Sequence, residues 1–141
     1  MLTRIDHVGI AVPDIETAVD AYVRLLGRLP SHRQVVESDG IEAVMFEVGE
    51  SRVELLGSTG PGSKIAAFLE KRGGGLHHVA YGVDDVQEAL DEYVGLGLRT
   101  LDTCPRRGAA SRLVAFLHPS AAVGVLTELC QLDPDAAEPG E

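Results

Sequence analysis

The sequence predicts an α+β fold in which two βαβββ modules pair into a half-barrel mixed sheet. The first observation is an internal repeat, because residues 7–22 read HVGIAVPDIETAVDAY and residues 78–93 read HVAYGVDDVQEALDEY. The offset is 71 throughout, since 78 − 7 = 71 and 93 − 22 = 71. The second observation is that each copy opens with a strand pattern, passes into a helical pattern and ends in three further strand patterns.

The first copy is predicted to run from about residue 3 to 58. Its opening strand, 4–12, is rich in apolar and β-branched residues. Asp14 is the predicted N-cap of a helix whose apolar residues recur at helical spacing, and Gly27 ends that helix. Tight turns at Asp-Gly and Gly-Glu then separate three predicted strands, at 33–37, 41–48 and 51–57.

The second copy, about residues 75–131, repeats the plan after a loop and a short helix in 59–74. That helix is expected from about 63 to 72. The predicted elements of the copy are a strand at 76–83, a helix at 85–95 and strands near 98–103, 112–118 and 123–131. Residues 1–132 are thus expected to form one domain. The acidic, apolar-poor tail 133–141 is expected to be disordered.

Composition excludes several classes of function. Twelve basic against 22 acidic residues give a net charge of −10, which argues against a nucleic-acid partner. The sequence has no long apolar run and no signal-peptide pattern, so we expect a cytoplasmic protein with no membrane partner. Both cysteines are expected to be free thiols. An anionic substrate would need a basic pocket, and the late cluster of Arg106, Arg107 and Arg112 is the candidate.

The residues that carry chemistry come in pairs, one member from each copy. His7 and His78 stand at equivalent places on the two opening strands, and Glu54 and Glu128 lie within the two closing strands. Two imidazoles and two carboxylates suit a divalent first-row metal. Taken alone, a strand histidine is more often structural, and a strand glutamate usually faces solvent. The glutamates also match less well than the histidines, since 128 − 54 = 74.

Three further histidines have simpler interpretations. His77 should point away from His78, outward or toward the periphery of the site, because neighbouring strand residues face opposite ways. His118 closes a strand before a proline and is expected to be structural, and His32 is expected in a loop.

Several segments together resemble the methylmalonyl-CoA epimerases of the vicinal oxygen chelate superfamily, which also includes glyoxalase I, extradiol dioxygenases and bleomycin-resistance proteins. These segments are IDHVGIAVPDIETAVDAY, VELL, KIAAFLEKRGGGLHHVAYGVDD, VAFLHP and GVLTEL, and the resemblance spans roughly residues 3–131. It implies the half-barrel fold of that superfamily and a homodimer. It also implies that His7, His78 and Glu128 bind one divalent ion, with Glu54 where the family has Gln or Glu. The ion would be cobalt, manganese, nickel, zinc or magnesium.

The reaction implied by the resemblance is inversion at C2 of 2-methylmalonyl-CoA, or of a close acyl thioester, through a metal-stabilised enolate. A base removes the C2 proton on one face and an acid returns a proton on the other. Many bacterial members carry a catalytic Glu three residues after the glycine of the second strand, where this chain has Ala43. Glu128, with Glu54, is therefore the predicted proton-transfer group.

Two alternatives stay open at this stage. The same fold and metal also suit an isomerase, lyase or cyclase that acts on another enolisable substrate, including glyoxalase-type isomerisation. An iron-dependent dioxygenase would use His7, His78 and Glu128, with Glu54 crowding the open positions. The second alternative is a non-catalytic protein that binds a small ligand in the same cavity.

Overall fold

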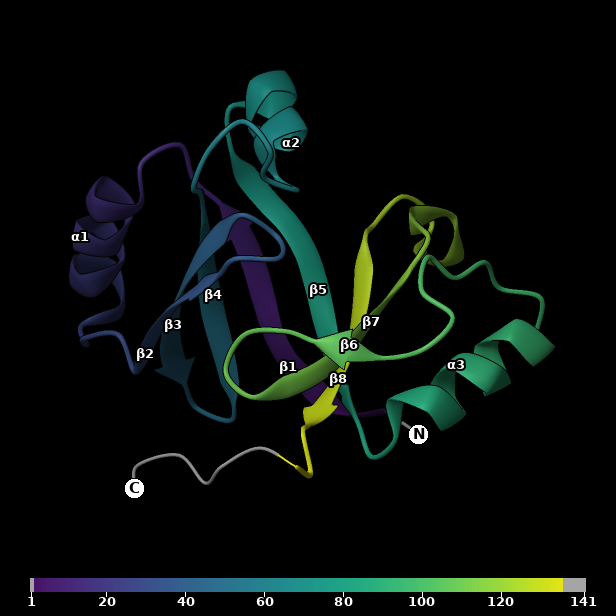
Figure 1. The fold of residues 1–141 in the computed structure, drawn as a ribbon. Helices are drawn as coiled ribbons and strands as arrows, with labels where there is room; N and C mark the ends of the chain where they lie inside the picture. The colour runs from purple at the N-terminus through teal and green to yellow at the C-terminus, as the bar shows by residue number, and fades with distance from the viewer. Residues whose placement is uncertain (1, 136–141) are drawn as a thin grey trace. The chain divides into compact units, whose positions relative to one another are not determined.

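The computed structural model describes residues 2–135 and contains eight strands, three α-helices and one 3-10 helix in that range (Figure 1). In chain order these are β1 (Leu2–Ala11), α1 (Ile15–Leu26), β2 (His32–Val36), β3 (Ile41–Val48), β4 (Ser51–Ser58), α2 (Ala66–Arg72), β5 (Gly75–Val83), α3 (Val86–Gly95), β6 (Arg106–Arg107), β7 (Arg112–Leu117), η1 (Pro119–Ala122) and β8 (Thr127–Leu132). The chain divides into two compact units. One unit is Asp6–His78, and the other joins the residues before Asp6 to those from Val79 onward.

The two units repeat one pattern of strand pairing. In the unit Asp6–His78 the hydrogen-bonded order is β2-β3-β4-β1, with β1 parallel to β4 and the other pairs antiparallel. In the other unit the order is β6-β7-β8-β5, with β5 parallel to β8 and the other pairs antiparallel. The opening strand of each copy therefore lies beside its closing strand, as expected for a duplicated βαβββ module.

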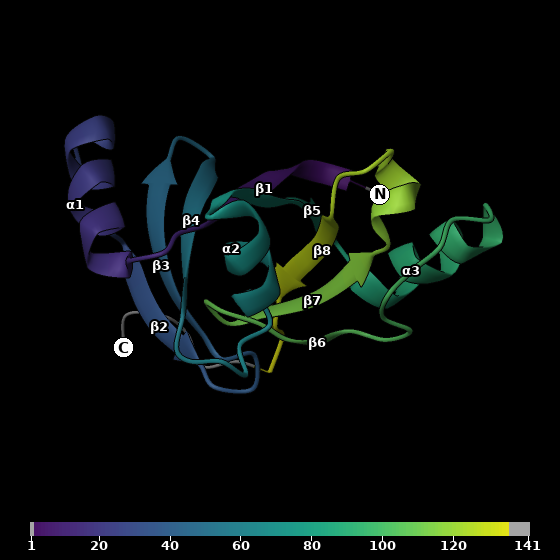
Figure 2. The same ribbon diagram turned by 90° about the horizontal axis from the view of Figure 1, so that it is seen from above.

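Helix α1 forms where the sequence predicts it. The Asp14 carboxylate accepts hydrogen bonds from the amides of Glu16 and Thr17. Gly27 adopts a left-handed conformation, with φ of 67°, and ends the helix. Figure 2 shows α1 beside β3 and β4. Its apolar side packs on the buried residues of those strands and of the preceding loop, namely Val12, Val44, Phe46 and Leu55.

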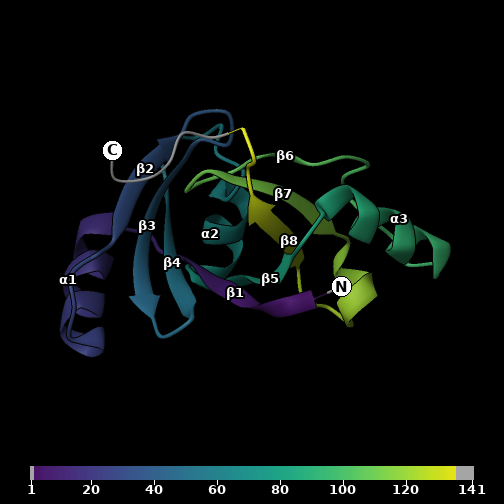
Figure 3. The same cartoon turned by 90° about the horizontal axis from the view of Figure 1, so that it is seen from below.

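Helix α3 covers one face of its own sheet in the same way (Figure 3). Asp85 caps its first turn through the amide of Glu88. A buried apolar cluster joins the helix to β5, β7 and β8 through Val83, Val86, Ala89, Leu90, Ala115, Leu117 and Leu129. Because side chains alternate along a strand, the neighbours of these residues point to the sheet face away from the helix. Glu128 is on that second face.

The predicted strand near 98–103 is wrong. Only Thr100 makes a bridge there, to Leu117, and the short strand β6 at Arg106–Arg107 takes the edge position instead. The Asp102 carboxylate accepts the amide hydrogen of Phe116. The amides of Leu101 and Asp102 both donate to the carbonyl of Phe116. A side chain thus replaces a backbone carbonyl in the pairing, which interrupts the regular ladder.

Two smaller boundaries also differ from prediction. The last strand begins at Thr127 rather than near residue 123, because η1 and a turn occupy the residues before it. His32 is the first residue of β2 rather than a loop residue, and its ring bonds to Gln34. The predicted disordered tail lies outside the described residues from 136 on. Asp133, at its start, is buried and its amide donates to the carbonyl of Ser111.

Candidate metal centre

Three of the predicted ligands meet inside the unit Asp6–His78. His7 comes from β1, Glu54 from β4 and His78 from the first residues of β5. The two Nε2 atoms are 3.1 Å apart, and Glu54 Oε1 is 3.5 Å from each. All three residues are at most 5% exposed. The side chains therefore present two imidazole nitrogens and one carboxylate oxygen to a single point.

Strand register explains why His7 and Glu54 share one face of the sheet. In the parallel pair β1·β4, His7 lies opposite Arg52 and Gly9 lies opposite Glu54. Residues two apart on a strand share a face, so His7 and Gly9 point the same way as Arg52 and Glu54. That face is the one turned away from α1, because the α1 core uses Val53 and Leu55.

Gly9 makes room for the second imidazole. A Cβ atom at this position would lie 2.1 Å from Cε1 of His78 and 2.4 Å from its Nδ1. Any side chain at residue 9 would therefore occupy the space that the ring of His78 fills. The glycine is needed for this close approach and not for an unusual backbone angle.

The ring of His7 is held from behind by a buried ion pair. Its Nδ1 lies 2.8 Å from Asp6 Oδ2, and the guanidinium of Arg52 donates to the same carboxylate oxygen. Burial desolvates Asp6 and by itself would raise its pKa, but the hydrogen bonds from His7 and Arg52 hold that pKa well below its usual value. An ionised Asp6 accepts the Nδ1 hydrogen and leaves Nε2 of His7 with its lone pair toward Glu54 and His78.

His78 is also contacted at its second ring nitrogen. Nδ1 of His77 lies 2.9 Å from Nδ1 of His78. The ring of His77 is half-buried and makes an edge contact with the ring of Phe68 at a centroid distance of 5.0 Å. His77 therefore borders the site, one of the two placements that the sequence predicts for it.

The donor set fits a divalent ion. The ligand atoms of His7, Glu54 and His78 all lie within 4.8 Å of one another, close enough to surround one ion after small side-chain movements. Imidazole nitrogens and a carboxylate suit zinc, cobalt, nickel, manganese or iron better than calcium. Asp6 behind His7 is the kind of outer carboxylate that commonly orients a metal-bound histidine.

Glu128 occupies the place in its own unit that Glu54 occupies in the other. It is buried in β8, where its register partners are Ala80 on β5 and Phe116 on β7. The corresponding partners of Glu54 are Gly9 and Met45. Both pairs of partners keep the repeat offset, since 80 − 9 = 71 and 116 − 45 = 71. The glutamates are thus equivalent, and the three extra residues lie between β7 and β8.

The side chains of β3 leave the site without a carboxylate at the position of Ala43. Ala43 is buried opposite Leu56, on the face that carries Glu54. Glu42 faces the other way and bonds to Arg33 across the sheet surface. Glu47 shares the face of Ala43 but is exposed near the strand end, where it accepts a hydrogen bond from Ser31. No carboxylate of β3 therefore stands in the position of Ala43.

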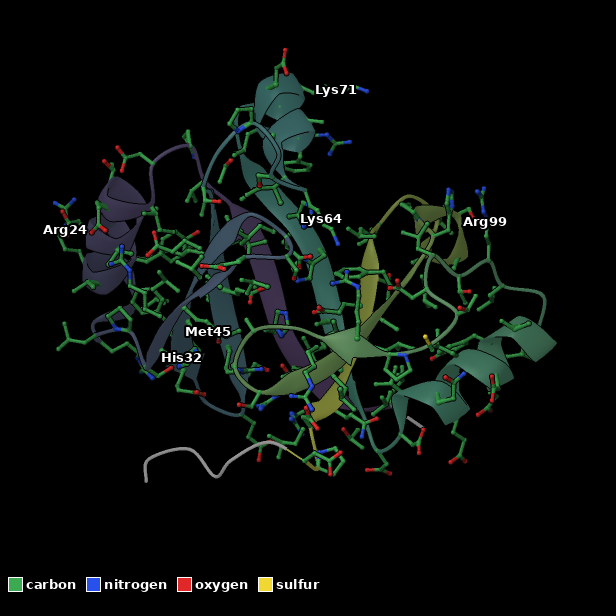
Figure 4. All side chains as sticks on the ribbon, in the orientation of Figure 1. Arg24, His32, Met45, Lys64, Lys71 and Arg99 are labelled. Carbon is green, nitrogen blue, oxygen red and sulfur yellow. The ribbon has the colours of Figure 1, made fainter. Side chains whose placement is uncertain are left out.

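The two remaining histidines make contacts of their own. His32 lies opposite Met45 in the register of β2 and β3, and the two labelled side chains are neighbours in Figure 4. The remaining predicted structural histidine, His118, caps η1 by accepting the amide hydrogen of Ser120. This contact agrees with the structural role expected for it.

The three arginines proposed for substrate binding have different surroundings. Arg106 and Arg112 share the sheet face of Glu128, since Arg106 pairs with Val114, two residues from Arg112. Arg106 lies over the ring of Phe116 and near Asp102, and Arg112 donates to the carbonyl of Ala110. Arg107 is exposed and forms an ion pair with Asp133. Its register partner, Leu113, lies on the sheet face that α3 covers.

The two cysteines are free thiols, as expected. Cys104 is exposed, whereas Cys130 is buried in β8.

None of the helices in the described range is long and apolar enough to cross a bilayer.

Comparisons with known proteins place the chain in a superfamily. Residues 6–116 match the model of the Glyoxalase/Bleomycin resistance protein/Dioxygenase superfamily. The chain therefore belongs to this superfamily, as the fold and the paired histidines indicate.

More specific matches come from sequence and structure. The ethylmalonyl-CoA/methylmalonyl-CoA epimerase of Cereibacter sphaeroides is 40% identical over 134 residues, which cover 94% of this chain and 100% of the relative. A variant of Streptomyces coelicolor methylmalonyl-CoA epimerase in complex with 2-nitronate-propionyl-CoA is 35% identical, with a TM-score of 0.90 over 98% of this chain and 100% of that chain. A methylmalonyl-CoA epimerase in complex with methylmalonyl-CoA and NH4+ has the same identity, TM-score and coverage.

The chain is thus a member of the methylmalonyl-CoA epimerase family and an isomerase of the epimerase class. The matches confirm the predicted fold class, the mixed α+β fold of βαβββ modules. The structure brings together three of the four predicted ligands and surrounds them with three residues that the sequence analysis did not single out, namely Asp6, Arg52 and Gly9. A signal for Asp6 was present, since an acidic residue directly before His7 in an apolar strand needs a buried partner.

Proposed function

We propose that this protein epimerises 2-methylmalonyl-CoA, or a close acyl thioester, at C2 in a metal-dependent reaction. The observation that carries the proposal is the buried convergence of His7, Glu54 and His78 in a chain of the methylmalonyl-CoA epimerase family. The relative from Cereibacter sphaeroides is named for both ethylmalonyl-CoA and methylmalonyl-CoA, so a somewhat larger C2 substituent belongs to the proposed substrate class.

The proposed ligands are Nε2 of His7, Nε2 of His78 and the carboxylates of Glu54 and Glu128. Glu128 is included because the register places it at the position equivalent to Glu54. A divalent ion bound there would supply Lewis-acid stabilisation for the negative charge that develops on the thioester oxygen when C2 loses its proton. Asp6 orients His7 for this role through the hydrogen bond at Nδ1.

Inversion at C2 needs one group that takes a proton on one face and another that gives a proton on the opposite face. Ala43 supplies neither. We assign the two roles to Glu128 and Glu54, which come from different copies of the repeat, and whichever carboxyl group carries the proton would be released from the metal in that state. One carboxylate accepts the C2 proton, the other carboxyl group delivers a proton to the opposite face, and exchange with solvent restores the starting protonation states.

The coenzyme A portion carries phosphates, which arginines bind well. Arg106 and Arg112 are the stronger candidates, because they lie on the sheet face of Glu128. Arg107 is the weaker candidate, since it is exposed and paired with Asp133. A homodimer and a cytoplasmic location remain predictions, and light scattering of the purified protein tests the first.

Proton exchange in D₂O tests the proposed reaction. The purified protein is stripped of metal, reloaded with cobalt and given 2R- or 2S-methylmalonyl-CoA, and mass spectrometry follows deuterium entry at C2 above the spontaneous rate. We expect metal-dependent exchange that is abolished in the variants His78→Ala and Glu128→Ala. Full exchange in Glu128→Ala would remove that residue from the mechanism. No exchange by wild-type protein that binds cobalt would rule out this substrate.

A second function keeps the metal site and changes the substrate. Ala43 favours it, because this buried β3 position on the face of Glu54 has no carboxylate, and the one carboxylate of β3 on that face, Glu47, is exposed near the strand end. The protein would then be a metal-dependent isomerase, lyase or cyclase that acts on another enolisable compound. Cobalt binding without exchange on methylmalonyl-CoA or ethylmalonyl-CoA is the result that favours this alternative.

A further inference from the structure

We propose that His77 is the positioning residue of His78, and that it performs for the second copy of the repeat what Asp6 performs for the first. The inference deepens the proposed function and rests on the metal site described there. Its direct basis is the 2.9 Å separation between Nδ1 of His77 and Nδ1 of His78.

The repeat gives the comparison with Asp6. Each ligand histidine is directly preceded by a polar residue, Asp6 before His7 and His77 before His78, and 77 − 6 = 71 is the repeat offset. Each of these residues contacts Nδ1 of the histidine that follows it, at 2.8 Å and 2.9 Å respectively. Equivalent positions with different chemistry thus make the same contact on both ligands.

Tautomer chemistry assigns the direction of the hydrogen bond. A neutral imidazole carries its proton on one ring nitrogen and a lone pair on the other. His78 directs Nε2 toward His7 and Glu54, so that nitrogen must keep its lone pair to bind a metal. With a metal bound at Nε2, the proton of His78 therefore belongs on Nδ1, from which it is donated to the lone pair on Nδ1 of His77. His77 then carries its own proton on Nε2.

The surroundings of His77 hold its ring in the orientation that this donation needs. Phe68 of α2 makes an edge contact with the ring of His77, with an interplanar angle of 77°. The guanidinium of Arg72 lies over Phe68, with its central carbon 5.3 Å from the ring centroid. Helix α2, which joins the two copies of the repeat, thereby fixes the residue that orients His78.

The two ligands are consequently unequal. The partner of His7 is an ionised carboxylate, which makes the ring a stronger electron donor, whereas the partner of His78 is a neutral ring. The contact at His78 is also half-buried rather than fully buried. Replacement of Asp6 would remove the partner of the buried guanidinium of Arg52. Replacement of His77 removes no such charged partner.

The test compares two replacements of His77. In His77→Asn the side-chain oxygen stands near the place of Nδ1 and still accepts the proton of His78, whereas His77→Leu removes the acceptor. Cobalt affinity is measured by competition with a chelator. We expect His77→Leu to bind cobalt about 10–100-fold more weakly than wild type, the range for loss of an outer-shell partner. We expect His77→Asn to stay within a few-fold of wild type.

Two further measurements separate positioning from a general structural effect. The matched control is His32→Leu, a replacement of an exposed histidine on β2, which should leave cobalt affinity unchanged. Ring NMR of the protein loaded with diamagnetic zinc reads the Nδ1 hydrogen of His78 directly. We expect that hydrogen to be protected from exchange with solvent in the wild type and in His77→Asn, and to exchange faster in His77→Leu.

The inference is overturned if His77→Leu binds cobalt as tightly as wild type, or if the Nδ1 hydrogen of His78 exchanges as fast in the zinc-loaded wild type as in His77→Leu. Equal losses in the Asn and Leu variants would also overturn it. Failure of the proposed reaction looks different, because cobalt affinity would still depend on residue 77 while methylmalonyl-CoA shows no exchange at C2. Wild-type protein that binds no cobalt would overturn both.

Discussion

Gly9→Ala is predicted to disrupt the metal centre while the protein still folds with reduced stability. The added Cβ would lie 2.1 Å from Cε1 of His78, 2.4 Å from Nδ1 and 2.6 Å from Nε2. Carbon atoms in contact prefer a separation of about 3.5–4.0 Å. The ring of His78 must therefore move by roughly 1.5 Å to restore an ordinary contact.

That displacement is large on the scale of metal coordination. Zinc-to-imidazole distances are near 2.0–2.1 Å, and a functional site holds them to about 0.2 Å. A moved His78 therefore ceases to be a ligand. We expect the loss of cobalt affinity to exceed the roughly 10–100-fold that follows from disturbing an outer-shell partner. The free energy of unfolding should fall by about 1–3 kcal/mol, the usual cost of overpacking a core.

Two matched glycine variants isolate the effect. In Gly57→Ala the new Cβ meets Cβ of Ile15 at 3.1 Å in the α1 core, so stability should fall while cobalt affinity is kept. In Gly62→Ala the new Cβ meets nothing within 4 Å, so neither quantity should change. Chelator competition gives the affinity and urea denaturation the stability. Wild-type cobalt affinity in Gly9→Ala would refute the assignment of His78 as a ligand.

The remaining predictions concern the scaffold. Asp14→Ala removes the N-cap of α1 and should lower the free energy of unfolding by about 1 kcal/mol in urea denaturation, with cobalt affinity unchanged. Burial, with Glu92 and Tyr81 nearby, raises the pKa of Tyr93 above its unfolded value of 10.0. The folded state therefore holds the phenol proton more tightly, so stability should fall as pH rises above 10, and less steeply in Tyr93→Phe. Equal slopes for the two proteins would contradict this. A thiol reagent should modify Cys104 in the native protein and Cys130 only after unfolding, and rapid modification of both would show that β8 is open.

Local features were predictable from the sequence because local physics decides them. Asp14 and Asp85 cap the two main helices where side-chain oxygens can accept the first free amides, and Gly27 ends α1 with a left-handed backbone. The repeat offset of 71 predicted equivalent strands for His7 and His78, and the strands have that equivalence. These features depend on residues a few positions apart or on a repeat that the amino-acid sequence itself contains.

Local patterns failed where a side chain competed with the backbone. The segment 98–103 has strand-like composition, yet the Asp102 carboxylate takes the amide of Phe116 and interrupts the ladder. The mismatch between Glu54 and Glu128 was likewise unresolved in the sequence. Only the register showed that both occupy the same place, because strand pairing and not residue number decides which side chains are neighbours.

The sequence by itself thus determined the modules, the helix caps and the residue types able to hold a metal. Tertiary structure alone decided which atoms meet. It placed Nε2 of His7 3.1 Å from Nε2 of His78, put the ring of His78 against Gly9, and seated Asp6 between His7 and Arg52. These contacts join residues up to 71 positions apart. Their distances depend on strand twist, register and ring orientation, which no local pattern of letters encodes.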